Sequence, residues 1–215
     1  REHSATWERL TVPVIVHLLA NGTAEVAQAA ALFSTIPNVR GIELGYTAGV
    51  SRKRASEFLA VASLEGDLPV IAQIPFDRVE DLAPYLARQG ADALTLTAPP
   101  RAVLPVFNDE DDVGVARFSR GRLYGRALFP LLLNTLSRWT SKLPVPVIAC
   151  GGISSAADAL TCLTLGAAAV QVDALLWRDP ALLNHIAQAL AGPSSVRPIA
   201  TGLPSSDEPE MEDSL

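Results

Sequence analysis

The chain has 215 residues, of which 49% are hydrophobic, and it carries a net charge of −6. That length supplies one sizeable core and leaves little for a second, so a single domain is expected over residues 1–192. The sparse, scattered Lys and Arg residues exclude a nucleic-acid surface. Every apolar run is broken well short of the ~18 residues that a membrane-spanning helix needs, so no membrane partner is expected.

The first residues resemble neither a secretory signal nor a transit peptide, which favours a cytoplasmic location. The two cysteines, Cys150 and Cys162, lack the spacing of a metal site or a disulfide framework. Both are expected to be small buried hydrophobic residues, so no metal site is predicted.

Six short apolar runs alternate with helical patterns along the chain. Strands are predicted over residues 12–19, 41–46, 68–74, 91–97, 145–150 and 168–172. Helices are predicted over residues 24–35, 53–64, 79–88, 127–142, 155–165 and 181–190. Strands that are hydrophobic throughout and alternate with helices predict an α/β fold with a parallel sheet covered by helices.

Glycines at the expected helix ends agree with these boundaries. Gly90 and Gly166 lie where helices are expected to end. Residues 99–120, with the acidic run 109–112, read as a long irregular loop, either a mobile flap over a site or solvated filler. Residues 193–215 are rich in Pro, Ser and acidic residues without periodicity, so they are predicted to be a disordered acidic tail.

Glycines stand at the ends of the later strands. Gly151 and Gly152 follow one buried strand, and Gly125 opens the preceding helix. Glycine lets the backbone approach a ligand closely, and a helix that begins just afterwards points its free N–H groups at an anion. The pattern therefore favours a phosphorylated small-molecule ligand.

Residues 121–130 read Gly-Arg-Leu-Tyr-Gly-Arg-Ala-Leu-Phe-Pro. This segment resembles the loop Gly-Gly-Leu-Ser-Gly-x-Ala-Leu-x-Pro of the dihydroorotate dehydrogenase family, and the similarity extends over roughly residues 11–190. The resemblance implies a TIM (β/α)8-type barrel that binds FMN and oxidises a CH–CH group, dihydroorotate to orotate, in pyrimidine biosynthesis. The six predicted strands correspond to the family's third to eighth strands.

On that alignment the first two β-α units of the barrel are missing. The chain also begins with Arg1 rather than Met, which favours a fragment of a longer protein. A barrel open at two strands exposes its edges and interior. A homodimer partner or a further chain segment is therefore expected to supply the missing strands.

The position that corresponds to the family's catalytic base holds a different residue in this chain. Where the family has Leu-Asn-x-Ser-Cys/Ser-Pro-Asn, residues 44–50 read Leu-Gly-Tyr-Thr-Ala-Gly-Val, so Ala48 stands at the base position. Thr47 is the nearest hydroxyl. It is either a substitute base or a turn residue, and an unactivated hydroxyl is a poor base.

Other family positions differ as well. Gln73 replaces a Lys that offsets charge on the flavin, although its amide still donates hydrogen bonds. Ala98 replaces an Asn that holds the pyrimidine. His17, at the end of its strand, either contacts the ligand or is a hydrogen-bonded strand-end histidine, and Arg126 opposes its helix dipole and is a candidate anion contact.

The resemblance implies FMN-phosphate contacts at Gly125, Gly151 and Gly152, together with Asp173 and Ala174. The last two replace a Gly-Thr pair whose backbone and hydroxyl bind that phosphate. A carboxylate beside a phosphate opposes binding. The substitutions leave a second reading open, in which the barrel is catalytically degenerate and serves as a phosphate-binding or assembly scaffold.

Overall fold

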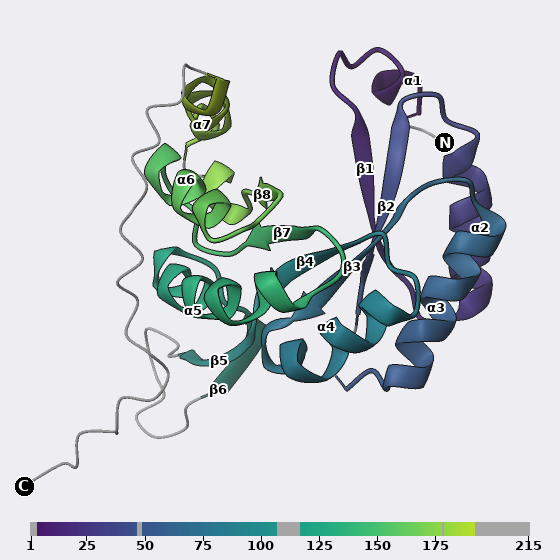
Figure 1. The fold of residues 1–215 in the computed structure, drawn as a ribbon, viewed down its shortest axis with the longest axis horizontal. Coiled ribbons are helices and arrows are strands. Elements are labelled where there is room, and N and C mark those ends of the chain that lie inside the picture. The colour runs from purple at the N-terminus through teal and green to yellow at the C-terminus, as the bar shows by residue number, and fades with distance from the viewer. Residues whose placement is uncertain (1–3, 47–48, 107–116, 178, 192–215) are drawn as a thin grey trace, which may run out of the picture.

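The structure is a computed structural model that describes residues 4–46, 49–106, 117–177 and 179–191 (Figure 1). All strands of its main sheet are parallel. In spatial order they are β1 (Val14–Leu19), β2 (Val39–Gly45), β3 (Val70–Pro75), β4 (Ala93–Ala98), β7 (Val147–Cys150) and β8 (Ala169–Gln171). The six strands predicted from hydrophobic periodicity are therefore confirmed, with boundaries that differ by one or two residues.

The predicted helices are confirmed too. Helices α2 (Thr23–Ser34), α3 (Arg52–Glu65), α4 (Val79–Arg88), α5 (Phe129–Trp139) and α6 (Ala156–Thr164) alternate with the strands, α7 (Leu182–Ala191) follows β8, and α1 (Ser4–Trp7) precedes β1. Short 3₁₀ turns are η1 (Phe76–Arg78), η2 (Arg126–Leu128), η3 (Thr140–Lys142) and η4 (Ala174–Trp177). The chain thus folds into six successive β-α units.

The sheet curls into a half-barrel, with the helices along its outer side (Figure 1). Leu82 and Leu86 of α4 and Ile42 and Leu44 of β2 have essentially no exposed surface. Burial of each such side chain contributes about 1.5–3 kcal/mol, so this outer layer holds the helices against the sheet. The strand ends are thereby fixed relative to one another, as in part of a TIM barrel.

Helix ends follow local rules. The Ser51 hydroxyl accepts the backbone N–H of Arg54 at 3.1 Å and caps α3. Gly90 and Gly166 adopt φ values of 99° and 94° just after α4 and α6, a conformation in which a Cβ is strained. Both predicted helix ends are confirmed.

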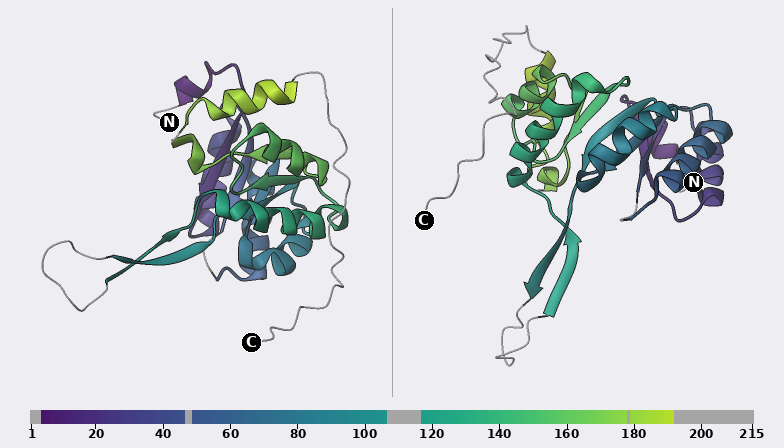
Figure 2. Two further views of the ribbon diagram at one scale, coloured as in Figure 1. Left: turned by 90° about the vertical axis from the view of Figure 1, so that its left-hand side faces the viewer. Right: turned by 60° about the horizontal axis from the view of Figure 1, so that its bottom comes forward.

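The prediction of an irregular loop over residues 99–120 is wrong at both of its ends. Strands β5 (Arg101–Val106) and β6 (Arg117–Arg122) form an antiparallel ribbon that projects from the barrel (Figure 2). Strand-favouring residues such as Val103, Val106 and Phe118 occur there, although Pro105 and the acidic run masked this signal in the sequence. The acidic residues 109–112 lie outside the described residues, as does the predicted tail, 193–215.

The two edge strands of the half-barrel carry an open face. Within the described part of the chain, β1 pairs only with β2 and β8 only with β7. The inward-facing Ile15 and Leu19 of β1 are 54% and 56% exposed. An exposed apolar strand edge is a template for association.

We therefore expect the 215-residue chain alone to associate. Size-exclusion chromatography with light scattering should show oligomers, and Ile15→Asn should lower their proportion because it makes the open face polar. The matched control is Leu64→Asn, which makes the same kind of change on the exposed side of α3. It should leave association unchanged. A compact monomer with cooperative unfolding would contradict the expectation.

Candidate functional site

A cavity of about 280 Å³ lies where the carboxyl ends of the parallel strands meet, and we call it the central cavity. The strand-end side chains His17, Gln73, Cys150 and Gln171 line it, together with Asp173, Leu19, Pro99, Arg122 and Tyr124. In open α/β sheets and TIM barrels this end carries the ligand, because loops there are free to vary while the scaffold stays rigid. The central cavity is therefore the candidate site.

A buried carboxylate lies behind the cavity wall. Glu43 is only 4% exposed, and its carboxylate accepts hydrogen bonds from His17 Nδ1 at 2.7 Å, Thr95 Oγ1 at 2.5 Å and Gln171 Nε2 at 3.4 Å. These partners come from β1, β4 and β8, so the bonds cross the concave side of the sheet. One carboxylate thus ties together strands that are far apart in the sequence.

Sequence reasoning missed Glu43. Its signal was a single acidic residue inside an otherwise apolar strand. Burial acts to raise the pKa of Glu43, but the hydrogen bonds from His17 and Thr95 outweigh it and hold this pKa below its ordinary value. The carboxylate is therefore charged at neutral pH and fixes the orientation of the His17 ring.

Gly45 makes room for that ring. A Cβ built on Gly45 would lie 2.6 Å from His17 Nε2, closer than real carbon contacts allow. The family motif has Asn at this position, so the imidazole of His17 occupies space that a side chain at position 45 would otherwise fill. Gly45 and His17 are consequently a matched pair. The His17 ring is hydrogen-bonded, as one reading expected, and it also lines the central cavity, so its contact with a ligand stays a prediction.

The Glu43 network predicts a pH-dependent stability. A carboxylate whose pKa is lowered on folding stabilises the fold above its ordinary pKa of 4.5 and loses that contribution as pH falls through the folded value. At about pH 7, Glu43→Gln should lower the free energy of unfolding by about 1.5–3 kcal/mol, because hydrogen bonds to a charged group are lost.

Urea unfolding from about pH 7 to about pH 3 measures this effect, and the gap between wild type and Glu43→Gln should shrink as the wild-type carboxylate becomes protonated. Glu57→Gln on α3 is the control. Its carboxylate only reaches Lys53 at 3.9 Å across an exposed helix face, so a change within about 0.5 kcal/mol is expected. A pH-independent gap for Glu43→Gln would contradict the prediction.

The glycines predicted as a phosphate cradle do lie together. Gly125, Gly151 and Gly152 all have positive φ values, 124°, 128° and 71°. A Cβ on Gly152 would meet Phe129 N at 2.5 Å and the Gly125 carbonyl at 3.0 Å, so the turn after β7 packs directly on the start of α5. On Gly151, which is buried, a Cβ would contact only Thr97 Oγ1, at 3.9 Å.

At the start of α6, two backbone N–H groups are already bonded to the chain's own side chains. The Asp158 carboxylate accepts the backbone N–H of Ser154 at 2.8 Å, and the Ser155 hydroxyl accepts the N–H of Asp158 at 3.1 Å. Burial acts to raise the pKa of Asp158, but hydrogen bonds from Ser154 and Ser155 and the charge of Arg126 lower it overall. The Asp158 carboxylate thus offsets part of the positive end of α6.

Asp173 does lie at the central cavity, as its position after the last strand predicted. Burial raises the pKa of the Cys150 thiol, and the charges of Asp173 and Glu43 add to that effect. Two carboxylates therefore act on this end of the barrel. Asp173 and Arg122 both line the cavity, so an anion placed there meets charges of both signs.

The other predicted site residues divide between the cavity and its surroundings. Gln73 is buried and lines the cavity, whereas Ala98 is buried at the end of β4, outside the cavity lining. Ala174 begins η4, immediately after Asp173. Arg126 is exposed, close enough to Asp158 to lower its pKa. Both predicted base positions, Thr47 and Ala48, lie outside the described residues.

Cys150 and Cys162 are free and buried, as predicted. Over the described ranges, His, Cys, Asp and Glu side chains form no group of three that suits a metal ion. Among the same residues, no helix combines the length and apolar character needed to cross a membrane.

Comparison with known proteins agrees with the loop motif. The family model described as dihydroorotate dehydrogenase matches residues 103–192. The chain is 28% identical over 190 residues to the "Dihydroorotate dehydrogenase B (NAD(+)), catalytic subunit" of Geotalea daltonii, covering 83% of this chain and 62% of that protein. The protein of the same name from Pelobacter propionicus is 29% identical over 195 residues, covering 85% and 63%.

The identically named protein of Cutibacterium acnes is 26% identical over 191 residues, covering 83% of this chain. The chain therefore spans a little over three fifths of the length of the curated relatives that it matches. The parallel half-barrel and its glycine turns are the architecture that a TIM-barrel family predicts for such a span. The chain is therefore similar to the dihydroorotate dehydrogenase family, by the family model over residues 103–192 and by these relatives over most of its length.

Proposed function

We propose that the protein is a dihydroorotate dehydrogenase-like flavoprotein oxidoreductase that acts on a CH–CH group. The observation that carries this proposal is the central cavity, where strand-end side chains lie beside the turn of Gly125, Gly151 and Gly152. The names of the relatives support dihydroorotate as the substrate. From the family resemblance we further propose cytoplasmic pyrimidine biosynthesis as the setting.

Most of the residues present fit FMN. Gly151 has no side chain to keep a phosphate from its backbone, and the buried Gln73 amide suits a hydrogen bond to a flavin carbonyl. Asp173 is the one cavity residue whose charge opposes the phosphate. FMN would accept a hydride from the substrate when bound, and this is the chemistry that no side chain supplies.

The chain's own residues would orient the reactants and hold the proton. Glu43 accepts from His17 Nδ1, which leaves Nε2 of that ring as the atom able to take a proton at the cavity. Gln73 donates hydrogen bonds without adding positive charge. We include His17 with Thr47 as the candidate groups for proton transfer, Thr47 by its place next to Ala48.

The direct test is the visible absorption of the protein produced at its full natural length. Bound flavin gives a yellow protein whose colour is bleached by dithionite, and denaturation should release FMN in about one equivalent per chain. A colourless, well-folded protein that takes up no FMN on titration would refute the proposal.

A catalytically degenerate barrel is the second candidate. Asp173 at the central cavity, Gln73 in place of Lys and Ala98 in place of Asn favour it. In this case the protein would act as a phosphate-binding or assembly scaffold. FMN binding without any turnover of dihydroorotate would separate this candidate from the enzyme.

In either case, the exposed apolar face of β1 is expected to be buried by another part of the assembly. The relatives are named as catalytic subunits of an NAD⁺-dependent enzyme. We propose that a second copy of the chain or a further chain segment covers the exposed face of β1. The substrate that we propose is a small molecule.

A further inference from the structure

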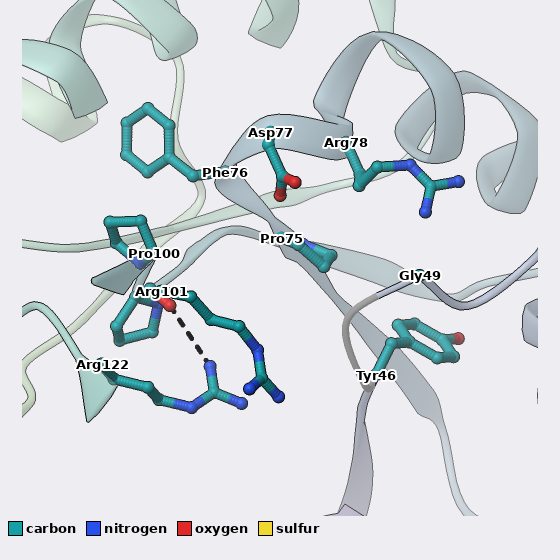
Figure 3. A pocket seen from close by; sticks show the side chains of 10 residues that line it. Tyr46, Gly49, Pro75, Phe76, Asp77, Arg78, Pro100, Arg101 and Arg122 are labelled. Atoms are coloured by element: carbon teal, nitrogen blue, oxygen red, sulfur yellow. Dashed lines mark hydrogen bonds between the residues drawn. The ribbon is translucent and has the colours of Figure 1, made fainter. Parts of the chain in front are cut away.

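A second cavity, of about 200 Å³, lies beside the first at the base of the β5–β6 ribbon, and we call it the arginine cavity (Figure 3). Its lining includes the guanidinium side chains of Arg78, Arg101 and Arg122, and one carboxylate, Asp77. In a chain with a net charge of −6, a hollow with this surplus of positive charge runs against the overall composition.

One of the three arginines is already neutralised. Arg78 forms an ion pair with Asp81, and its Nη1 donates to the Val50 carbonyl at 2.9 Å. In Figure 3 its guanidinium points away from Arg101. Arg78 therefore contributes shape to the cavity more than free charge.

The other two arginines are placed opposite each other by the ribbon. Arg101 of β5 pairs directly with Arg122 of β6, so both side chains stand on the same face of the ribbon. Arg122 Nη1 donates only to the Pro99 carbonyl, at 3.3 Å, and among the described residues neither guanidinium has a carboxylate partner. Like charges directly opposite each other destabilise a strand pair, so this arrangement favours an anion between them.

We propose that the arginine cavity binds the carboxylate group of a small organic acid through Arg101 and Arg122. Planar guanidinium groups donate paired hydrogen bonds that match the two oxygens of a carboxylate. Asp77 on the opposite wall opposes a doubly charged phosphate more strongly than a singly charged carboxylate. The small volume also suits an acid group better than a nucleotide.

The arginine cavity adjoins the central cavity, because the two share wall residues. Pro99 and Arg122 line both of them. A molecule anchored by its carboxylate at Arg101 and Arg122 would extend its remaining atoms toward Gln73 and His17. The anion site does not depend on FMN or on any redox step, so it stands or falls separately from the proposed function.

Chemical modification tests the site in the assembled, full-length protein. Phenylglyoxal modifies arginine, and peptide mass spectrometry reports the rate at each residue. Succinate should slow modification of Arg101 and Arg122 by roughly tenfold relative to chloride at equal ionic strength. Arg120, on the same strand and exposed, is the internal reference and should react at an unchanged rate.

Matched variants complete the test. Arg101→Gln should abolish the protection of Arg122 by succinate, whereas Arg120→Gln, which removes the same charge two residues from Arg122, should preserve it. Inorganic phosphate is the second probe. Stronger protection by phosphate than by succinate would overturn the carboxylate assignment, and equal protection of all three arginines, or of none, would overturn the site.

Discussion

Dihydroorotate oxidation by the FMN-loaded protein is expected to be about 10²–10⁴ slower than in an enzyme of this class that has its catalytic base. Ala48 stands where the family motif has Cys or Ser, and Gln73 stands where it has Lys. An alanine takes no proton, and a neutral amide does not offset the charge that develops on a reduced flavin. Both changes raise the barrier of the same step.

Steady-state turnover of dihydroorotate with an artificial electron acceptor, at saturating FMN, measures this loss. Ala48→Cys combined with Gln73→Lys should raise kcat, since it restores both groups, whereas Gln73→Lys alone should raise it less. Ordinary turnover by the wild type would contradict the prediction. His17→Gln would then show whether the ring held by Glu43 provides the base, because the variant would lose activity with its pH profile altered.

Asp173→Gly is expected to tighten FMN binding, roughly 5-fold to several hundredfold. The carboxylate of Asp173 lies at the central cavity where the family motif has Gly. Repulsion between two unit charges about 4 Å apart amounts to about 1–4 kcal/mol, depending on how far the site excludes water. Glycine removes both the charge and the volume, and it leaves the turn at Gly151 unchanged.

Flavin fluorescence titration of wild type, Asp173→Gly and Asp173→Asn separates the two effects. Asp173→Asn removes only the charge, so its advantage over wild type should shrink between low salt and about 1 M salt, where the screening length falls to about 3 Å. Any further gain in Asp173→Gly reports the volume and should not depend on salt. Equal affinities for the three proteins would mean that the phosphate binds elsewhere.

Local patterns carried most of the fold. Strands such as β3 and β4 were recognisable because a parallel sheet is buried on both faces, so its strands are mostly apolar along their length. The helices between them were recognisable from apolar residues at three- and four-residue spacing. Gly90 and Gly166 marked helix ends for an equally local reason, the backbone conformation that only glycine adopts without strain. The loop motif at residues 121–130 resembles the family whose model matches residues 103–192.

The site depended on contacts that no local pattern records. Glu43 accepts hydrogen bonds from Thr95 and Gln171 across the concave side of the sheet, and these residues are 52 and 128 positions away in the sequence. The local sequence around Glu43 therefore could not predict its partners. Curvature of the sheet brings these side chains together. Gly45 could be explained only once the position of the His17 ring was known.

The β5–β6 ribbon shows the same division. Its short strands, interrupted by Pro105, resembled an irregular loop because strand pairing in a ribbon is decided by register rather than by burial. That register alone sets Arg101 opposite Arg122 and makes a cationic cavity from two arginines 21 residues apart. The sequence thus determined which strands and helices form, because burial and backbone strain act on neighbouring residues. Which charged groups meet was left to the curl and the register of the folded sheet.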